Sequence, residues 1–241
     1  MNSESFLPLT RVDGLRLLPA SDLITTGPVD HADWNYKSVL GWIERRRFKL
    51  ALSMLPPAKS GRLLELGYGS GVFLPELASW CTALYGLDVH PHAGEVMRRL
   101  SGYGIQAALT QGTAEAMPYE DHYFDAIVTV SAMEFIPDID RAVRELHRVL
   151  APTGVLVVVT PNASPILDFG LKLMTGESAR KDYGDRRAAV IPALKQWFTV
   201  DAEGTSPPMT GKLAALHRVL RLLPTRQAAL RDGEQRAEAT V

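Results

Sequence analysis

The residues with the clearest chemical potential are three alternating glycines that follow an acidic residue. In the segment Arg62-Leu-Leu-Glu-Leu-Gly-Tyr-Gly-Ser-Gly-Val72, Glu65 stands two positions before Gly67, and Gly69 and Gly71 follow at alternate positions. Glycine adopts positive φ at little cost and lets a ligand lie directly against the backbone. The apolar residues before the turn are typical of a short buried strand. A turn of this kind, at the carboxyl end of a first strand, usually holds a nucleoside-containing ligand.

Two phosphate-binding motifs with similar glycines fit the segment less well. The dinucleotide fingerprint has a small residue three positions after its second glycine, where this chain has Val72. A P-loop has a Lys-Ser/Thr pair after its second glycine, and the segment contains no such pair. The spacing therefore disfavours both of these phosphate sites.

Three stretches further along the chain have the same character of strands and turns. The first, Leu84-Tyr-Gly-Leu-Asp-Val-His90, contains Asp88. That residue lies about 20 positions beyond the first glycine, where a carboxylate can accept hydrogen bonds from both ribose hydroxyls. The second comprises a polar loop at 112–118 and an apolar run at 124–131. The third, at 146–160, combines the end of a helix, a Pro-Thr-Gly turn and an apolar run.

The order and spacing of these stretches resembles the class I S-adenosylmethionine-dependent methyltransferases over roughly residues 63–160. The glycine segment is similar to the family's first motif, and the loop at 112–118 to its adenine-contacting loop. The resemblance implies a doubly wound α/β fold with a mostly parallel sheet of Rossmann-like type and helices on both faces. Its form looks most like the branch that modifies quinones and secondary metabolites.

The resemblance also implies which residues hold the cofactor, S-adenosylmethionine. Glu65 would receive the ammonium of the methionine portion, and Asp88 would hold the ribose. Val89 would pack against the adenine, and Ser131 would contact the methionine portion. The expected cofactor-binding residues are Glu65, Gly67, Tyr68, Gly69, Gly71, Asp88, Val89, Ala114, Glu115 and Ser131.

Methyl transfer from a sulfonium needs alignment more than strong catalysis by side chains. Holding the acceptor in line with the methyl group is worth on the order of 7 to 11 kcal/mol. A base helps when the acceptor is a neutral hydroxyl, and the candidates are Glu134 and His90. A solvated turn carboxylate and a partly exposed loop histidine are the simpler explanations of these two residues. His90 and His92 have no evident third ligand, so no metal site is predicted.

Other candidate residues also have ordinary structural explanations. Glu65 and Asp88 stand at strand ends, where a carboxylate can cap a helix, but the ordered motifs favour the cofactor role. Glu115 is equally explained as an exposed loop residue. Arg47 interrupts the apolar stripe of its helix, so it either reaches the cofactor's carboxylate or extends to solvent.

Two further regions are candidates to border the substrate. Trp34 and Tyr36 precede the first helix, where many relatives have a lid, but packing of their rings on the body is simpler. Tyr183, Asp185 and Arg186 belong to a charged loop beyond the fifth strand, on the side of the sheet where ligands bind. A plain surface turn explains this loop equally well.

Composition is that of a globular enzyme. The chain has 241 residues, a net charge of -1 and one cysteine, Cys81. A near-neutral chain has no field that would attract nucleic acid, so the expected partner is a small-molecule methyl acceptor. One cysteine cannot form an intrachain disulfide, and no apolar run approaches membrane-spanning length, so we expect a cytoplasmic protein.

The elements that must position these residues can be outlined from periodicity. Apolar residues at helical spacing predict a helix over 38–55, and Asp138 is the expected N-cap of a second helix that extends to about residue 150. The unbroken apolar run at 155–159 predicts a central strand covered on both faces. We expect an arm and lid helix at 1–57, a cofactor-binding core at 58–203 with a substrate-side insertion near 161–187, and a C-terminal part at 204–241.

The last strand is left undecided by the sequence. The family resemblance implies an antiparallel seventh strand, but Leu213, Leu216, Leu220 and Leu223 recur at helical spacing. They predict a helix that covers the sheet, with dimerisation or contact with a membrane surface as alternatives. Residues after about 225 are polar and are predicted to be disordered.

Three alternatives to small-molecule methylation stay open. A methyltransferase acting on RNA or protein is disfavoured by the near-neutral charge and the lack of a recognisable accessory domain. A Rossmann-type nucleotide-binding oxidoreductase would bind NAD in place of S-adenosylhomocysteine. A regulatory or scaffold protein would bind the cofactor without turnover.

Overall fold

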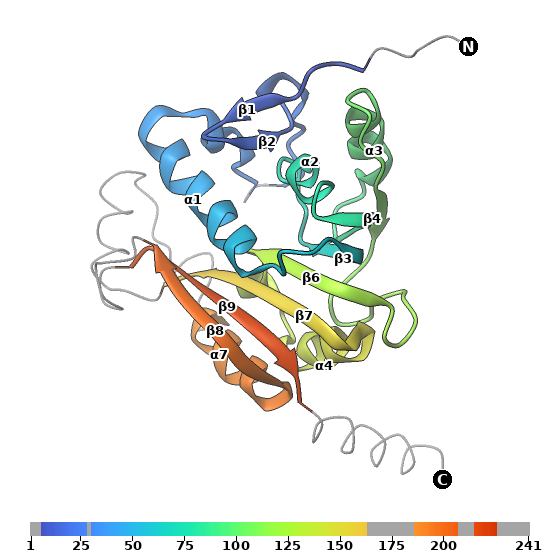
Figure 1. Ribbon diagram of the computed structural model, residues 1–241, viewed down its shortest axis with the longest axis vertical. Helices are drawn as coiled ribbons and strands as arrows, with labels where there is room; N and C mark the ends of the chain where they lie inside the picture. Colours follow the sequence, from blue (N-terminus) through green and yellow to red (C-terminus); the bar gives the residue numbers. More distant parts are fainter. Residues whose placement is uncertain (1–5, 28–29, 163–185, 207–214, 226–241) are drawn as a thin grey trace.

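A seven-stranded sheet runs through the centre of the molecule (Figure 1), with the strand order β5-β4-β3-β6-β7-β9-β8. The computed structural model describes residues 6–27, 30–162, 186–206 and 215–225. The strands of this sheet are β3 (Ser60–Leu66), β4 (Cys81–Asp88), β5 (Ala108–Gln111), β6 (Phe124–Val130), β7 (Leu150–Pro161), β8 (Phe198–Ser206) and β9 (His217–Pro224).

The five strands β3 to β7 are parallel, and β9 is antiparallel to both β7 and β8. Parallel strands need crossover connections, which place helices on the faces of the sheet. The doubly wound, mostly parallel α/β fold expected from the sequence is therefore confirmed, and the undecided last strand is present.

The predicted C-terminal helix is wrong over 217–224, because these residues form β9. Leu220 and Leu222 pack on one face of the sheet and Val219 packs on the other, so the strand is buried on both sides. A strand covered on both faces has no polar alternation, and its leucines can fall by chance at helical spacing. Since Leu220 and Leu223 of this stripe lie in β9, between β7 and β8, they no longer support dimerisation or membrane contact.

Helices cover both faces of the sheet (Figure 1). On one face, α1 (Ser38–Met54), α2 (Leu74–Leu77) and α3 (Ala93–Ser101) contribute to a shared hydrophobic core. On the other face, a second core is formed with α4 (Ile139–Val149) and α7 (Arg186–Trp197). Asp138 accepts a hydrogen bond from the amide of Arg141 at 3.0 Å, which confirms it as the N-cap of α4.

The N-terminal arm forms regular structure before α1. It contains a hairpin of β1 (Thr10–Val12) and β2 (Leu15–Leu17), followed by the short 3-10 helices η1 (Ala20–Asp22) and η2 (Ala32–Tyr36). The hairpin is fixed to α1, because buried Arg45 binds Asp13 at 2.7 Å. The arm is thereby held against the body near the carboxyl edge of the sheet.

Some expectations lie beyond the described residues. These are the insertion over 163–185, including Tyr183 and Asp185, and the tail after 225. The division into arm, core and C-terminal part stays a prediction. Within the described ranges, no helix combines the length and apolar character needed to cross a bilayer.

Candidate functional site

The carboxyl ends of β3, β4 and β6 meet at one edge of the sheet, where the glycine turn begins. Glu65 pairs with Gly86 in the β3–β4 register, and the amide of Gly67 donates to the carbonyl of Leu87 at 2.8 Å. The chain extends from β3 to β4 on one side and returns to β6 on the other side. Ligands of open α/β sheets bind at such a switch point.

The three glycines of the turn have different roles. Gly67, Gly69 and Gly71 have φ values of 78°, 51° and 77°. A Cβ atom on Gly67 would lie 2.4 Å from Cβ of Ala132, and one on Gly71 would lie 2.7 Å from Cγ1 of Val96. At Gly69 the nearest atom to such a Cβ would be 3.8 Å away. Two glycines therefore permit close packing, and Gly69 faces more open space.

The carboxylate of Asp88 holds the turn in place. Oδ2 accepts the Gly69 amide at 2.8 Å, and Oδ1 accepts the Val89 amide at 2.7 Å. A carboxylate has about four acceptor positions, so these bonds leave capacity for a ligand hydroxyl. The structural role that we considered for Asp88 and the expected ribose role are therefore compatible.

Glu65 is a buried carboxyl group beside the turn. Burial raises its pKa well above the usual range, the nearby Asp88 charge raises it further, and the Arg47 charge opposes the shift. Its Oε2 atom has no hydrogen-bond partner among the described residues. A buried acidic group without a partner is suited to receive a cationic ligand group, such as an ammonium.

Three hydroxyl groups around the turn are buried in the same way. The hydroxyls of Tyr68, Ser70 and Ser131 have no partner in the described part of the chain. Ser131 also has a φ of 53°, a strained value for a residue other than glycine. Strained residues and unpartnered polar atoms are concentrated at ligand sites. The chemistry of this edge therefore fits a polar ligand that carries an amino acid and a ribose.

The adenine side of the expected site is formed by the loop after β5. The amide of Gly112 donates to the carbonyl of Asp88 at 2.8 Å, which places this loop beside Asp88. The Val89 side chain is 66% exposed, so a planar ring can cover it. Ala114 packs into the core on the α4 side, which leaves only its backbone for a ligand contact.

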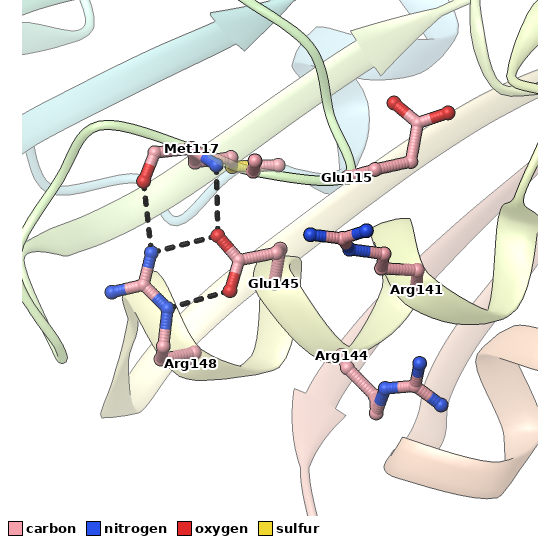
Figure 2. Close-up of a pocket in the computed structure, with 7 residues that line it drawn as sticks. Glu115, Met117, Arg141, Arg144, Glu145 and Arg148 are labelled. Atoms are coloured by element: carbon pink, nitrogen blue, oxygen red, sulfur yellow. Dashed lines mark hydrogen bonds and ion pairs between the residues drawn. The ribbon is translucent and has the colours of Figure 1, made fainter.

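Glu115 lies in a surface pocket of about 390 Å³ (Figure 2). The pocket is lined by residues of the loop and of α4, and it contains none of the glycine turn. Within it, Arg148 is fixed by Glu145 at 2.7 Å and by the carbonyl of Met117 at 2.9 Å. Because this charge is already satisfied within the fold, we assign the pocket a structural role.

Comparisons with known proteins agree with this geometry. Residues 64–158 match the family model described as a methyltransferase domain. Over these residues the chain is similar to the class I S-adenosylmethionine-dependent methyltransferases. It is 34% identical over 125 residues to a demethylmenaquinone methyltransferase of Roseiflexus castenholzii, covering 49% of this chain and 51% of that protein. A demethylmenaquinone methyltransferase of Thermus thermophilus is also 34% identical, over 55% of this chain and 59% of that protein.

The chain spans about half the length of the curated relatives that it matches. Among solved structures, N-methyltransferase NodS of Bradyrhizobium japonicum in complex with S-adenosyl-L-homocysteine has a TM-score of 0.57 and 19% identity. That similarity covers 82% of this chain and 94% of NodS, and at this identity it shows the shared fold alone.

His90 occupies a different environment from the expected one. It is buried, so the interpretation as a partly exposed loop residue is wrong. Its Nδ1 accepts the amide of His92 at 3.1 Å, and its Nε2 lies 2.9 Å from the carbonyl of Gly69. The bond at Nδ1 makes Nε2 the donor, so neither nitrogen offers a lone pair to a substrate proton. No group of three metal-ligating side chains is found in the described ranges.

Glu134 is buried in η3 (Met133–Phe135), directly after β6. The expected solvated turn carboxylate is therefore wrong for this residue. Burial raises the pKa of Glu134 to about 7, with Arg187 and Arg47 acting in the opposite direction. Neither carboxylate oxygen has a hydrogen-bond partner within the residues that the structure describes. The turn is buried because η3 packs against α7 on one face of the sheet.

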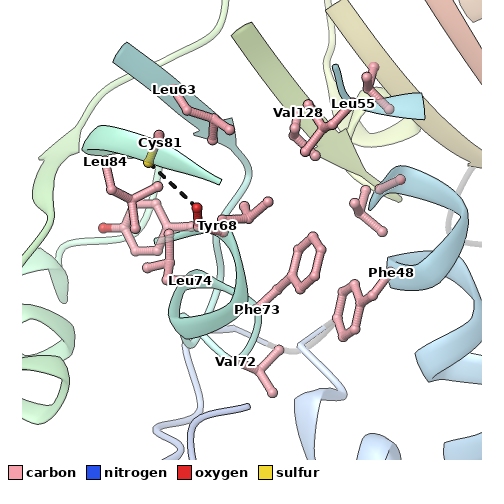
Figure 3. Packing of buried hydrophobic residues seen from close by; sticks show 14 of the residues in the cluster. Phe48, Leu55, Leu63, Tyr68, Val72, Phe73, Leu74, Cys81, Leu84 and Val128 are labelled. Atoms are coloured by element: carbon pink, nitrogen blue, oxygen red, sulfur yellow. Dashed lines mark hydrogen bonds between the residues drawn. The ribbon is translucent and has the colours of Figure 1, made fainter. Parts of the chain in front are cut away.

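Arg47 is mostly buried, and its Nε atom is shielded from solvent. Its side chain is 18% exposed, it binds Glu44 at 2.7 Å, and its guanidinium lies 5.2 Å from the centre of the Phe48 ring. Phe48 stacks on Phe73 at 4.2 Å, and this contact joins α1 to the segment after the glycine turn (Figure 3). The packing places the Arg47 charge close enough to lower the pKa values of Glu65 and Glu134.

Two residues of the site were missed by the sequence analysis. His217 begins β9, and Arg187 in α7 donates to the carbonyl of Asn162 at 3.0 Å. Burial lowers the pKa of His217 to about 3, and the Arg47 charge adds to this shift. His217 was not recognised as a site residue because a helix was predicted for this part of the chain. It also lies far in sequence from the motifs. A short apolar run that ends at Pro224 was the signal that could have indicated a strand here.

The remaining candidates have structural roles in the described part of the chain. The hydroxyl of Tyr36 donates to the carbonyl of Leu18, and the Trp34 ring stacks on His31 at 4.3 Å. These contacts agree with packing of the arm, which was the simpler explanation. Arg186 donates to the carbonyl of Phe135 at 3.4 Å, and so it contacts the η3 segment that carries Glu134.

Proposed function

We propose that this methyltransferase transfers a methyl group from S-adenosylmethionine to a small-molecule acceptor. The observation that carries the proposal is the pair of acidic side chains, Glu65 and Asp88, on neighbouring strands beside an open glycine turn. Their environments differ: Glu65 is buried without a partner for Oε2, whereas Asp88 is fixed by backbone amides. Glu65 is suited to bind the ammonium of the methionine portion, and Asp88 is suited to bind the ribose diol.

The other cofactor contacts follow from this placement. The ribose lies at Asp88, the adenine covers Val89 beside the loop that carries Ala114 and Glu115, and the methionine portion extends toward Ser131. The backbone of Gly67, Tyr68, Gly69 and Gly71 lines the methionine portion. The buried hydroxyls of Tyr68 and Ser131 support this proposal, because a polar ligand would satisfy them.

When bound, the cofactor supplies an electrophilic methyl group on a positively charged sulfur. The residues of this chain supply binding, orientation and exclusion of water. The N-terminal arm supports the last of these, because Thr26 and Asp30 lie near the position that a Gly69 side chain would occupy. Asp30 accepts hydrogen bonds from the amide and the hydroxyl of Thr26 at 3.1 Å and 2.7 Å, which fixes this part of the arm.

The acceptor class is proposed from charge and from the names of the relatives. The net charge of -1 gives no electrostatic attraction for nucleic acid. The relatives named as demethylmenaquinone methyltransferases support a quinone-like small molecule. We place the enzyme in the cytoplasm, since its single cysteine, Cys81, is a buried free thiol that fits a reducing compartment.

Isothermal titration calorimetry with S-adenosylhomocysteine and with NAD tests the cofactor directly. We expect the protein to bind S-adenosylhomocysteine and not NAD. Binding of NAD in its place would support an oxidoreductase of Rossmann type. Binding of S-adenosylhomocysteine without product from a broad panel of acceptors would support a regulatory protein without turnover.

Replacing Asp88 tests the ribose position. We expect Asp88→Ala to weaken binding of S-adenosylhomocysteine by at least tenfold, about 1.4 kcal/mol. The variant loses an acceptor for the ligand diol and also releases the Gly69 amide. Calorimetric titration of the purified variant gives the dissociation constant.

Asp125→Ala is the matched control, because Asp125 also accepts a backbone amide, that of Arg62 at 2.7 Å. Arg62 and Asp125 belong to the opposite, amino-terminal ends of their strands. We expect this variant to lose a similar carboxylate-amide bond and to keep its affinity for S-adenosylhomocysteine. An unchanged dissociation constant in Asp88→Ala would show that the ribose does not lie at Asp88.

A further inference from the structure

We propose that Glu134, Arg47 and His217 form the acceptor half of the site, and that Glu134 takes the proton of a hydroxyl group on the acceptor. This inference rests on the proposed methyl transfer and adds two points to it. It names the chemical class of the acceptor, a neutral small molecule with a hydroxyl group. It also names the group that receives the proton.

The sheet brings the three residues together from distant parts of the sequence. The amide of Ser131, at the end of β6, donates to the carbonyl of Val159 in β7 at 2.8 Å. Pro161 at the end of β7 pairs with His217 at the start of β9. The carboxyl edge therefore runs from the glycine turn through Glu134 to His217.

Side-chain alternation directs part of this edge toward α1. Residues two apart in a strand point to the same face. Glu65 thus shares a face with Leu63, and His217 shares one with Val219, and both of these apolar residues pack in the core on the α1 side. Arg47 of α1 is near enough to lower the pKa values of Glu65, Glu134 and His217. Because α1 packs against β6, β7 and β9, the Arg47 charge acts on both halves of the site.

The cluster contains buried polar atoms that the described part of the fold leaves without partners. These are both carboxylate oxygens of Glu134, Nδ1 of His217 and Nε of Arg47. A buried polar atom without a partner destabilises the folded state. Glu134 and His217 are 0% and 8% exposed, so bulk water does not satisfy them freely. A ligand that hydrogen-bonds to them relieves this destabilisation on binding.

The charges around Glu134 favour a neutral acceptor over a cationic one. Arg47 faces it from α1 and Arg187 faces it from α7, and both charges lower its pKa. His217 is neutral at physiological pH because burial lowers its pKa. With two cations, one neutral ring and one partly ionised carboxylate, the acceptor half repels an ammonium. It accommodates a hydroxyl, which can donate to the carboxylate.

Near pH 7 the carboxyl group of Glu134 is balanced between its two forms, which suits it to accept a proton. In the proposed step, the O–H bond of the acceptor breaks and its proton binds to the carboxylate of Glu134. The acceptor oxygen forms a bond to the methyl carbon. The carbon–sulfur bond of the donor breaks, and its electron pair remains on sulfur, which becomes neutral.

The test is methyl transfer by the full chain to probes of three kinds: 4-methylcatechol and 2-naphthol as hydroxyl acceptors, benzylamine as an amine, and vesicles of phosphatidylethanolamine. Mass spectrometry would measure the methylated products and S-adenosylhomocysteine. We expect methylation of a hydroxyl probe. We expect Glu134→Gln to lower kcat about a hundredfold or more without changing the affinity for S-adenosylhomocysteine. Glu120→Gln, an exposed loop carboxylate, is the control and should behave as wild type.

The pH profile provides a second readout that needs no variant. The kcat/KM of the wild type should rise with pH and level off above about 7, the pKa of Glu134, whereas residual activity of Glu134→Gln should lack this rise. A loss of less than about tenfold in Glu134→Gln would overturn the inference. Methylation of the amine or lipid alone, or of no hydroxyl probe, would also overturn it. If the wild type still binds S-adenosylhomocysteine in those cases, the proposed methyl transfer is not contradicted. If the wild type does not bind S-adenosylhomocysteine, the proposed function is itself wrong.

Discussion

Gly67→Ala should destabilise the protein by about 2 to 5 kcal/mol, because the new methyl group meets two separate obstacles. The first is the positive φ of 78°, which costs a residue with a Cβ about 1 to 2 kcal/mol. The second is the Cβ of Ala132, 2.4 Å from the position that the new methyl group would occupy. Overpacking of this kind adds about 1 to 3 kcal/mol. Urea denaturation followed by circular dichroism measures the free energy of unfolding.

Gly69→Ala is the matched variant, because its φ is also positive but the nearest atom to the new Cβ is 3.8 Å away. We therefore expect only the backbone cost, about 1 to 2 kcal/mol. Adding Ala132→Gly to Gly67→Ala should recover the steric part and leave the backbone part. Equal losses in Gly67→Ala and Gly69→Ala would show that the packing of the β3 turn against Ala132 is not close.

Glu134→Gln should be more stable than the wild type at pH 8 by about 3 kcal/mol, with the advantage absent near pH 4.5. The pKa of Glu134 rises from 4.5 in the unfolded chain to about 7 in the folded protein. Stability contributed by the protonated group is present below the lower value and is lost as pH rises toward the higher one. The glutamine is neutral throughout this interval, so it avoids the cost of a buried charge.

The difference between the two stability curves isolates this group from others that titrate nearby. His217 acts in the opposite sense, because its pKa is lowered and its contribution grows as pH rises from about 3 to 6.5. Both the wild type and Glu134→Gln contain His217 and Glu65. To first order, the contributions of these two residues therefore cancel when one stability curve is subtracted from the other. Chemical denaturation at several pH values, with Glu120→Gln as a flat reference, provides the measurement. Parallel curves for Glu134→Gln and the wild type would mean that Glu134 titrates as an ordinary exposed carboxyl.

Local patterns were sufficient to predict that Glu65 and Asp88 stand at neighbouring strand ends beside the glycine turn. The glycine segment, Glu65 and Asp88 belong to one β-turn-α-β unit whose order is fixed by short connections. Parallel strands bring their carboxyl ends to one edge, so two acidic residues at strand ends were expected to be neighbours. The N-cap at Asp138 and the central position of β7 followed equally from local chemistry.

The acceptor half was not predictable in this way. Its three members come from α1, the turn after β6 and the first residue of β9, and their meeting depends on how β9 inserts between β7 and β8. The leucines of β9 fit a helix as well as a strand, because a strand buried on both faces loses its alternation. Glu134 looked like a surface residue because its burial comes from packing of η3 against α7.

The sequence by itself thus determined the doubly wound, mostly parallel α/β class, the glycine turn and the two carboxylates that border it. Only the tertiary structure decided that Arg47 is mostly buried, that Glu134 is buried and that His217 joins them. Local sequence specifies backbone conformation and the apolar face of each element. Burial and electrostatic shifts arise from side chains distant in sequence, so they become defined when the elements pack.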